Sequence, residues 1–161
     1  MLVDLTLFGL AIPICILAAW SDLKTMTIPN SLSIIGAAVV VAAVLLLLPF
    51  DQALTRIITG LVVLVVGFIL FSLGGIGGGD VKLAAALFPL IATSDLIPFT
   101  LLLSITTLCA VLTHKIVGSL GMLKPAIANW ASWQDQKKFP FGFALSGAFL
   151  IYLGLSAMNP A

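Results

Sequence analysis

Apolar residues follow one another along this chain in long blocks that short polar breaks separate. A helix that crosses the roughly 30 Å apolar core of a bilayer needs about 20 mostly apolar residues. Six blocks come near that length, at residues 5–20, 32–48, 53–73, 80–93, 96–117 and 141–158. The pattern therefore predicts an all-α, polytopic membrane protein with about six transmembrane helices, forming a single membrane-embedded domain over residues 1–161.

The fourth block is the shortest of the six, and Pro89 interrupts it. A proline inside a helix removes one backbone hydrogen bond and kinks or ends the helix. The fourth block is therefore expected to form either a tilted span or a re-entrant segment buried among the other helices.

Composition supports a membrane location and excludes two classes of function. Hydrophobic residues make up 61% of the chain and charged residues only 8%, against about a quarter charged in soluble domains. The sequence has no basic patch of the kind that binds nucleic acid, and no Cys/His spacing that would bind a metal such as zinc. Cys15 and Cys109 both fall inside apolar blocks and are expected to be small buried residues.

Basic residues are concentrated in alternate connections between the blocks. Six of the seven lie in the first, third and fifth connections, namely Lys24, Lys82, Lys115, Lys124, Lys137 and Lys138. Connections rich in Lys and Arg stay in the cytoplasm. We therefore expect an inner (cytoplasmic) membrane protein with these connections in the cytoplasm and both termini outside. The long fifth connection, with Trp130 and Trp133, is expected to lie on the membrane surface.

Two of the six aspartates share a local pattern. Asp22 stands in SDLKTMTIPN and Asp80 in GGGDVKLAAAL, so an apolar residue and a lysine follow each. Both are predicted at the cytoplasmic edge, and acids at membrane depth are functional candidates. A helix C-terminus near Asp22 disfavours a carboxylate, whereas a helix N-terminus near Asp80 favours one. Such a pair suits acid–base chemistry, in which one carboxyl activates water and the other donates a proton.

Simpler interpretations of the same residues stay open. Asp80 could only cap the fourth helix, and Asp22 could only be a loop residue. Lys24 and Lys82 could only anchor helices at the membrane surface. His114, at the end of the fifth block, is expected to be a boundary residue rather than a catalytic one.

Glycines precede Asp80 in the sequence GGIGGGDVK. Glycine adopts positive φ at low cost and lets another chain approach closely. Gly77, Gly78 and Gly79 are therefore expected to bend the backbone before Asp80 and to border a substrate strand.

These motifs resemble those of type IV prepilin peptidases, which are polytopic aspartic proteases with a Gly-x-Gly-Asp motif. The first family motif matches Asp22, Lys24, Ile28, Pro29 and Asn30. The second matches Gly77, Gly79, Asp80 and Lys82, and a third matches Pro140, Phe141 and Gly142. Many members have a proline where Phe143 stands, so the third match is looser.

The resemblance implies an endopeptidase that removes the short basic leader from prepilins or pseudopilins at the cytoplasmic membrane face, without a metal or cofactor. Asp22 and Asp80 are implied as the catalytic pair, with the other matched residues in supporting or substrate-binding roles. Larger members also N-methylate the product through a domain with CxxC motifs, which this chain lacks. The short form resembles the TadV/CpaA branch, which processes Flp-type pilins, and archaeal preflagellin peptidases are also small.

Other classes of function compete with this one. A small transporter or ion carrier would also use a broken helix and paired acids, and an inactive subunit could bind pilins without cutting them. For Asn30, a cap on the second helix is favoured over a hydrogen bond to the loop near Asp22.

Overall fold

The computed structural model describes residues 1–120, 125, 128–134 and 139–159, and this part of the chain is helical without strands. Five helices are long and apolar enough to cross a membrane: α1 (Leu2–Thr25), α2 (Asn30–Leu47), α3 (Phe50–Ser72), α5 (Leu96–Ser119) and α8 (Phe141–Met158). The all-α polytopic prediction is confirmed. Lys124, Lys137 and Lys138, which carry much of the expected charge of the fifth connection, lie outside the described residues.

Prolines mark the starts of three long helices. Pro29, Pro49 and Pro140 are the N-cap residues of α2, α3 and α8, with φ of −59°, −53° and −72°. Because proline has no N–H to donate, it cannot continue a preceding helix, but its fixed φ suits the entry to a new one. The sequence breaks before α2 and α3 therefore become short links between helices.

The fourth block forms the short helix α4 (Gly78–Leu87) and the 3₁₀ turn η1 (Phe88–Leu90). Ten residues at about 1.5 Å each extend only about 15 Å, which is half of the apolar core of a bilayer. Pro89 lies inside η1, and a second turn, η2 (Thr93–Asp95), leads into α5. The fourth segment is therefore too short to cross a membrane by itself.

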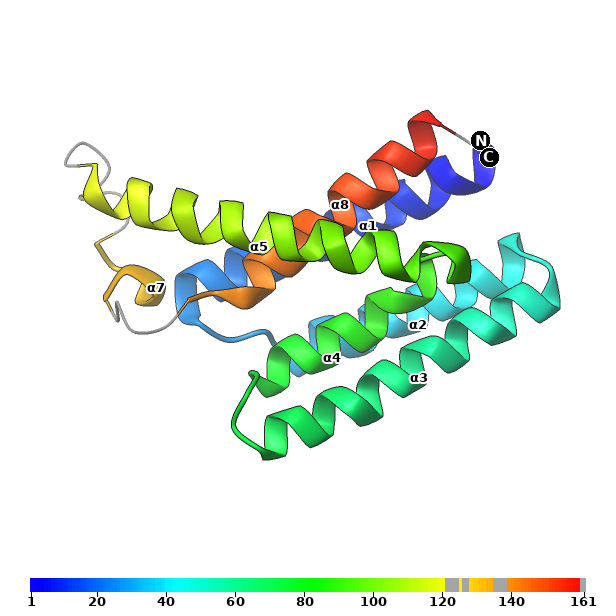
Figure 1. The fold of residues 1–161 in the computed structure, drawn as a ribbon, viewed down its shortest axis with the longest axis horizontal. Helices are drawn as coiled ribbons and strands as arrows, with labels where there is room; N and C mark the ends of the chain where they lie inside the picture. The colour runs from blue at the N-terminus through cyan, green and yellow to red at the C-terminus, as the bar shows by residue number, and fades with distance from the viewer. Residues whose placement is uncertain (121–124, 126–127, 135–138, 160–161) are drawn as a thin grey trace.

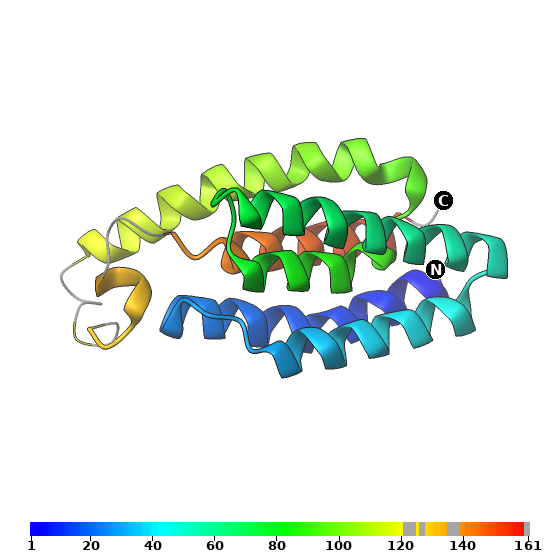
Figure 2. The same cartoon turned by 90° about the horizontal axis from the view of Figure 1, so that it is seen from below.

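The helices pack as two groups, which α4 and the contact of α1 with α2 connect (Figures 1 and 2). Helices α1 and α8 lie side by side and α5 packs on α8, whereas α2 and α3 pack against α4. Both termini lie at one end of the bundle (Figure 1). The end of α1 and the starts of α4 and α8 lie at the other end, so the topology brings the segments that carry Asp22 and Asp80 together.

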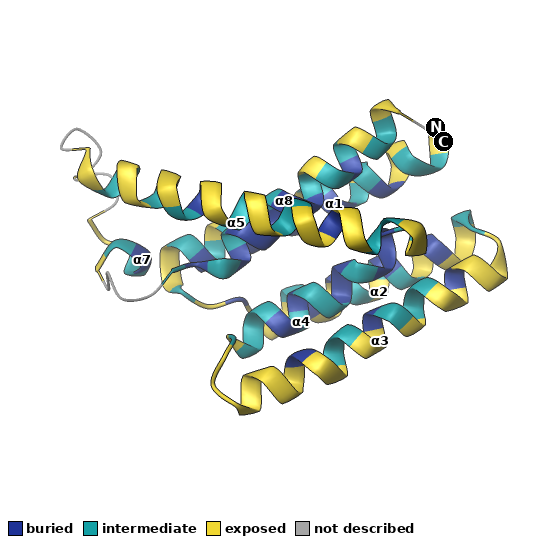
Figure 3. Ribbon diagram, in the orientation of Figure 1, coloured by how far each residue is buried: buried dark blue, intermediate teal, exposed yellow. Residues whose placement is uncertain are grey.

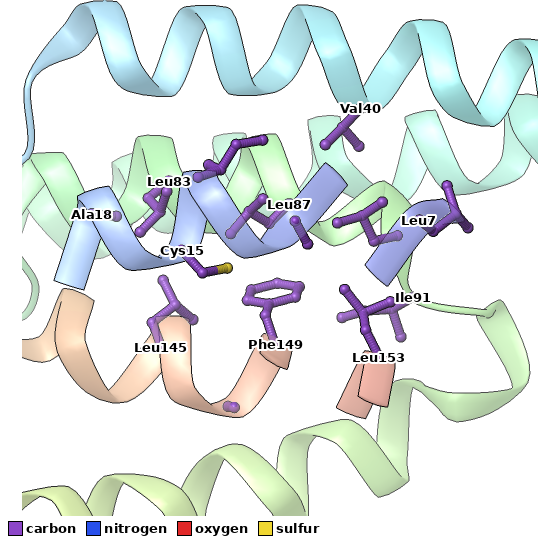
Figure 4. Packing of buried hydrophobic residues seen from close by; sticks show 14 of the residues in the cluster. Leu7, Cys15, Ala18, Val40, Leu83, Leu87, Ile91, Leu145, Phe149 and Leu153 are labelled. Carbon is purple, nitrogen blue, oxygen red and sulfur yellow. The ribbon is translucent and has the colours of Figure 1, made fainter. Parts of the chain in front are cut away.

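The core lies between α1, α4 and α8, where Cys15, Leu87, Leu145 and Phe149 are buried (Figure 4). Outward faces of α3 and α5 are apolar and exposed, as expected for helices that contact lipid (Figure 3). Cys15 is buried as predicted, but the prediction for Cys109 is wrong, because it lies on the exposed face of α5.

Helices α3 and α4 approach closely at two glycines. A Cβ built on Gly60 would lie 2.9 Å from the backbone oxygen of Ala85, and one on Gly67 would lie 2.6 Å from Cγ1 of Val81. Small residues allow such close packing of helices in membranes. Close packing is important there because burial of apolar surface does little to drive helices together.

We predict that Gly60→Ala lowers the thermal midpoint of the protein in detergent. The added methyl meets backbone and the rigid ring of Pro89, so overpacking should cost about 1–3 kcal/mol. Gly9→Ala is the matched control, since no atom lies within 4 Å of a Cβ there. Equal midpoints for the two variants would contradict the packing described for α3 and α4.

Candidate functional site

Asp22 lies in the last turn of α1 rather than in a loop, so the loop interpretation is wrong. The helix ends at Met26, whose left-handed backbone (φ 55°, ψ 30°) directs its N–H to the carbonyl oxygen of Asp22. A short link follows, in which the Ser21 hydroxyl donates a 2.8 Å hydrogen bond to the Thr27 carbonyl. The Asp22 side chain is only 5% exposed, and it is the one buried charged group among the residues that the structure describes.

Asp80 is the third residue of α4, and the N-cap is Gly77, which makes the cap interpretation of Asp80 wrong. Its carboxyl group folds back toward Gly77, where a Cβ would lie 2.7 Å from Oδ2 of Asp80. The absence of a side chain at Gly77 therefore leaves room for the carboxyl group.

The backbone of the glycine run turns at a different residue from those that the sequence suggested. Gly74 is the glycine with positive φ (78°), whereas Gly78 and Gly79 are helical and Gly77 is extended. The bend expected before Asp80 is present, but it lies at residues 73–76 rather than at Gly77, Gly78 and Gly79. The expected close approach of another segment occurs at Gly79, where a Cβ would lie 3.3 Å from Cβ of Ile28.

Ile28 belongs to the first sequence motif and contacts the segments that carry the second and third. Its side chain is buried and lies between the start of α4 and the start of α8. A Cβ on Gly79 would lie 3.4 Å from the Ile28 nitrogen, and a Cβ on Gly142 would lie 2.7 Å from Cδ1 of Ile28. A side chain at Gly79 would force Ile28 to shift, and one at Gly142 would meet both the end of the Ile28 side chain and the Asp22 carboxyl group.

The N-terminus of α8 brings the two carboxyl groups to one place. A Cβ on Gly142 would lie 2.9 Å from Oδ2 of Asp22, and the Phe143 N–H donates a 3.3 Å hydrogen bond to the same oxygen. The Gly142 amide is close enough to influence both Asp22 and Asp80. The contribution of Phe143 was not foreseen, because 121 residues separate it from Asp22 and a backbone donor has no sequence signal.

Asp80 is half-buried and belongs to α4, which is not one of the five spanning helices. Burial raises the pKa of Asp80, the negative charge of Asp22 raises it further, and the Gly142 N–H lowers it, with a resulting value of about 7. A helix N-terminus alone would have favoured the ionised form of Asp80. The raised pKa shows that this expectation from the sequence is wrong. The pair can therefore hold one proton near neutral pH.

The lysines of the two motifs do not pair with the aspartates in the described residues. Lys82 instead donates a 2.9 Å hydrogen bond from Nζ to Oδ1 of Asn30. The predicted cap role of Asn30 is wrong, because Pro29 is the N-cap of α2 and no side chain caps it. Lys24 is exposed, and its Nζ lies 5.5 Å from the ring centroid of Trp20, which fits an anchor at the membrane surface.

Two other titratable side chains of the described residues, those of His114 and Tyr152, make contacts of their own. His114 stacks on Trp133 with ring centroids 4.5 Å apart, and the Trp133 side chain donates to the His114 carbonyl. At the other end of the bundle, the Tyr152 hydroxyl donates a 2.8 Å hydrogen bond to Asp95. Within the described residues, no three His, Cys, Asp or Glu side chains cluster as a metal site would require.

The arrangement is therefore two carboxyl groups, one buried and one half-buried, beside backbone N–H groups at one end of a helical bundle. It can hold a shared proton, accept a proton from water and return one to a leaving group.

Comparison with protein families gives a match. The model of the type IV leader peptidase family matches residues 9–113, which is more than half of the chain and includes both Asp22 and Asp80. The matched range ends before α8, so it does not include Gly142. No curated protein and no solved structure matches the chain.

We predict that Asp80 titrates with a pKa of about 7. The infrared band of a protonated carboxyl group should be present at pH 6, fade as the pH rises through 7 and be absent in Asp80→Asn. Asp22→Asn should shift the remaining titration to lower pH, because the charge that opposes ionisation of Asp80 is gone. Asp51→Asn, an exposed aspartate in the first turn of α3, is the control and should leave the titration unchanged.

Proposed function

Because the chain belongs to the type IV leader peptidase family, we propose that it is an aspartic endopeptidase whose catalytic residues are Asp22 and Asp80. Its proposed reaction is removal of the short basic leader from Flp-type prepilins at the cytoplasmic face of the inner membrane. The observation that carries the proposal is the meeting of the two carboxyl groups at Gly142, one from α1 and one from α4.

The chemistry follows from the shared proton. A water molecule between the carboxyl groups loses a proton to the Asp22 carboxylate as its oxygen attacks the scissile carbonyl carbon. Asp80, which holds the shared proton below about pH 7, supplies the proton that the departing nitrogen needs. The C–N bond breaks, and no covalent intermediate with the enzyme forms.

The substrate has to be extended where it is cut, since a helix keeps its carbonyl groups in hydrogen bonds. The exposed glycine segment before α4, which includes Gly75 and Gly77, would border this extended strand. Lys82 and Asn30 on one side, and Pro140 and Phe141 at the start of α8 on the other, are proposed to support or contact it.

The position of the pair supports a peptidase over a transporter. Asp22 is in the last turn of α1 and Asp80 is in the first turn of α4, so both lie near one end of the bundle. A cation path would place its acids near the bilayer midplane. The same end carries Lys24, Lys82 and Lys115, and this supports a cytoplasmic location.

We predict that Asp22→Asn and Asp80→Asn each abolish leader removal. Loss of general acid–base catalysis should lower the rate by about 10²–10⁴-fold, which co-expression with a Flp-type prepilin would show as loss of the mass shift. Asp51→Asn should cleave like the wild type, and membrane levels of all variants would be compared.

Cleavage that survives either substitution would contradict the two-aspartate mechanism. If the wild type cleaves a preflagellin but not a prepilin, the chemistry stands and the substrate assignment changes. Ion flux in vesicles without cleavage of either substrate would favour a transporter.

We also predict that cleavage slows as the pH rises above 7. Because the raised pKa of Asp80 is about 7, higher pH removes the shared proton, and the rate should fall about tenfold per unit beyond it. A rate that stays constant from pH 7 to 9 would show that Asp80 is not the proton donor. Parallel measurement of folded protein at each pH separates this effect from unfolding.

A further inference from the structure

The two aspartates of the pair belong to different groups of helices. Asp22 is on α1, which packs along α8, whereas Asp80 is on α4, which packs with α2 and α3. Contacts of α1 with α2 and of α4 with α8 cross the boundary between the two groups. The distance between the carboxyl groups therefore depends on how the groups are fixed relative to each other, and not only on packing within either group.

A polar contact joins the two groups at the end of the bundle opposite the pair. The Tyr152 hydroxyl of α8 accepts a 3.1 Å hydrogen bond from the Ala92 N–H and donates a 2.8 Å hydrogen bond to Oδ2 of Asp95. Ala92 and Asp95 belong to the link that follows α4 and η1. Arg56 of α3 donates a 3.2 Å hydrogen bond to the Leu90 carbonyl at the start of this link. The link is thus held to α3 by Arg56 and to α8 by Tyr152.

Two segments of similar length run in the same direction from the pair to this contact. On α8, ten residues lead from Gly142 to Tyr152, which is about 15 Å of α-helix. In the other group, ten residues of α4 and η1 lead from Asp80 to Leu90, which is about 16 Å because a 3₁₀ turn rises more per residue. The segments meet at both ends, so a shift of α8 along its axis at one end also occurs at the other.

Apolar packing alone does not fix the position of α8 along its axis. The Tyr152 ring packs edge-to-face on Phe99 of α5, with ring centroids 5.6 Å apart, and Phe149 packs on Phe88 of η1 with centroids 6.0 Å apart. Such contacts tolerate small displacements, because each pair of atoms contributes little. Hydrogen bonds weaken steeply when their geometry is distorted. The Tyr152 hydroxyl is therefore the group that fixes the register of α8 against the link.

On the basis of the proposed function, we propose that Tyr152 is a positioning residue for the reaction, which sets the distance between the Asp22 and Asp80 carboxyl groups from the far end of the bundle. Its hydroxyl holds α8, and with it α1, in register with the link that continues α4. The hydroxyl touches neither aspartate and acts only through the helices. A contact remote from the cut thereby controls the geometry of the catalytic pair.

Tyr152→Phe tests this role, because it removes the hydroxyl and keeps the ring that packs on Phe99. With a Flp-type prepilin, kcat should fall by about 10–10²-fold through misplacement of the carboxyl groups, and KM should stay close to the wild-type value. The matched control is Phe99→Leu, which weakens the same aromatic packing and retains both hydrogen bonds of Tyr152. Phe99→Leu should lower the thermal midpoint and keep the wild-type kcat.

The titration of Asp80 is a readout that a loss of stability alone would not change. Burial and the charge of Asp22 raise the pKa of Asp80 more than the Gly142 N–H lowers it. If the carboxyl groups separate in Tyr152→Phe, the infrared band of protonated Asp80 should therefore fade at a lower pH than in the wild type. Phe99→Leu should titrate like the wild type. A lower thermal midpoint of Tyr152→Phe with unchanged kcat and titration would show a structural role only and overturn the proposal.

Substitutions of Asp95 give a second test that leaves Tyr152 in place. Asp95→Asn keeps an oxygen that can accept the hydrogen bond from Tyr152, whereas Asp95→Ala removes the acceptor. Asp95→Asn should retain the wild-type kcat, and Asp95→Ala should lower kcat and shift the titration of Asp80 to lower pH. Wild-type kcat and titration in Asp95→Ala would count against the proposal.

Failure of the inference is distinguishable from failure of the proposed function. If cleavage requires both aspartates but Tyr152→Phe has the wild-type kcat and titration, the positioning proposal is wrong and the peptidase stands. If cleavage does not depend on the aspartates, the proposed function itself is wrong. The infrared titration needs no substrate, so it still shows in that case whether Tyr152 fixes the distance between the carboxyl groups.

Discussion

The site depends on one steric constraint, the close approach of three backbone segments around the side chain of Ile28. The link between α1 and α2, the start of α4 and the start of α8 meet there because Gly79 and Gly142 have no side chains. Asp22 and Asp80 come together as a consequence, since each is attached to one of these segments. The acids are thus positioned by packing, while the N–H groups at the start of α8 supply the hydrogen bonding that a buried carboxylate requires.

Helix α8 has a larger role than its mainly apolar sequence suggests. Its first turn contacts Asp22, and its far end carries Tyr152, which donates to Asp95 and accepts a hydrogen bond from the Ala92 N–H. Arg56 donates to the Leu90 carbonyl beside this network. Polar contacts at both ends thus fix the position of α8, which contacts the two aspartates. Such contacts matter in a membrane because burial of apolar surface contributes little to the association of helices there.

Hydropathy was sufficient to predict an all-α polytopic fold and the five long helices, although the fourth block proved too short to span. The choice of Asp22 and Asp80 as the site rests on the rarity of acids at membrane depth and stays a prediction. Details that depend on distant contacts were not predictable. The pKa of Asp80 responds to burial and to Asp22 rather than only to its own helix end, and Asn30 pairs with Lys82 instead of capping α2. The left-handed turn falls at Gly74 within a run of glycines, and composition does not indicate which glycine takes it.

The contacts of Gly79 and Gly142 have a consequence for the evolution of this chain. Every change of a glycine codon to another residue adds at least a Cβ atom, so each such step tightens the contact with Ile28 at Gly79 and brings a Cβ against both Ile28 and the Asp22 carboxyl group at Gly142. A smaller side chain at residue 28 would not open either position, because a Cβ on Gly79 meets the Cβ and the backbone nitrogen of Ile28, and a Cβ on Gly142 also meets the Asp22 carboxyl group. The outward face of α3, which has to be apolar but fits no partner among the described helices, is by contrast free to exchange one aliphatic residue for another.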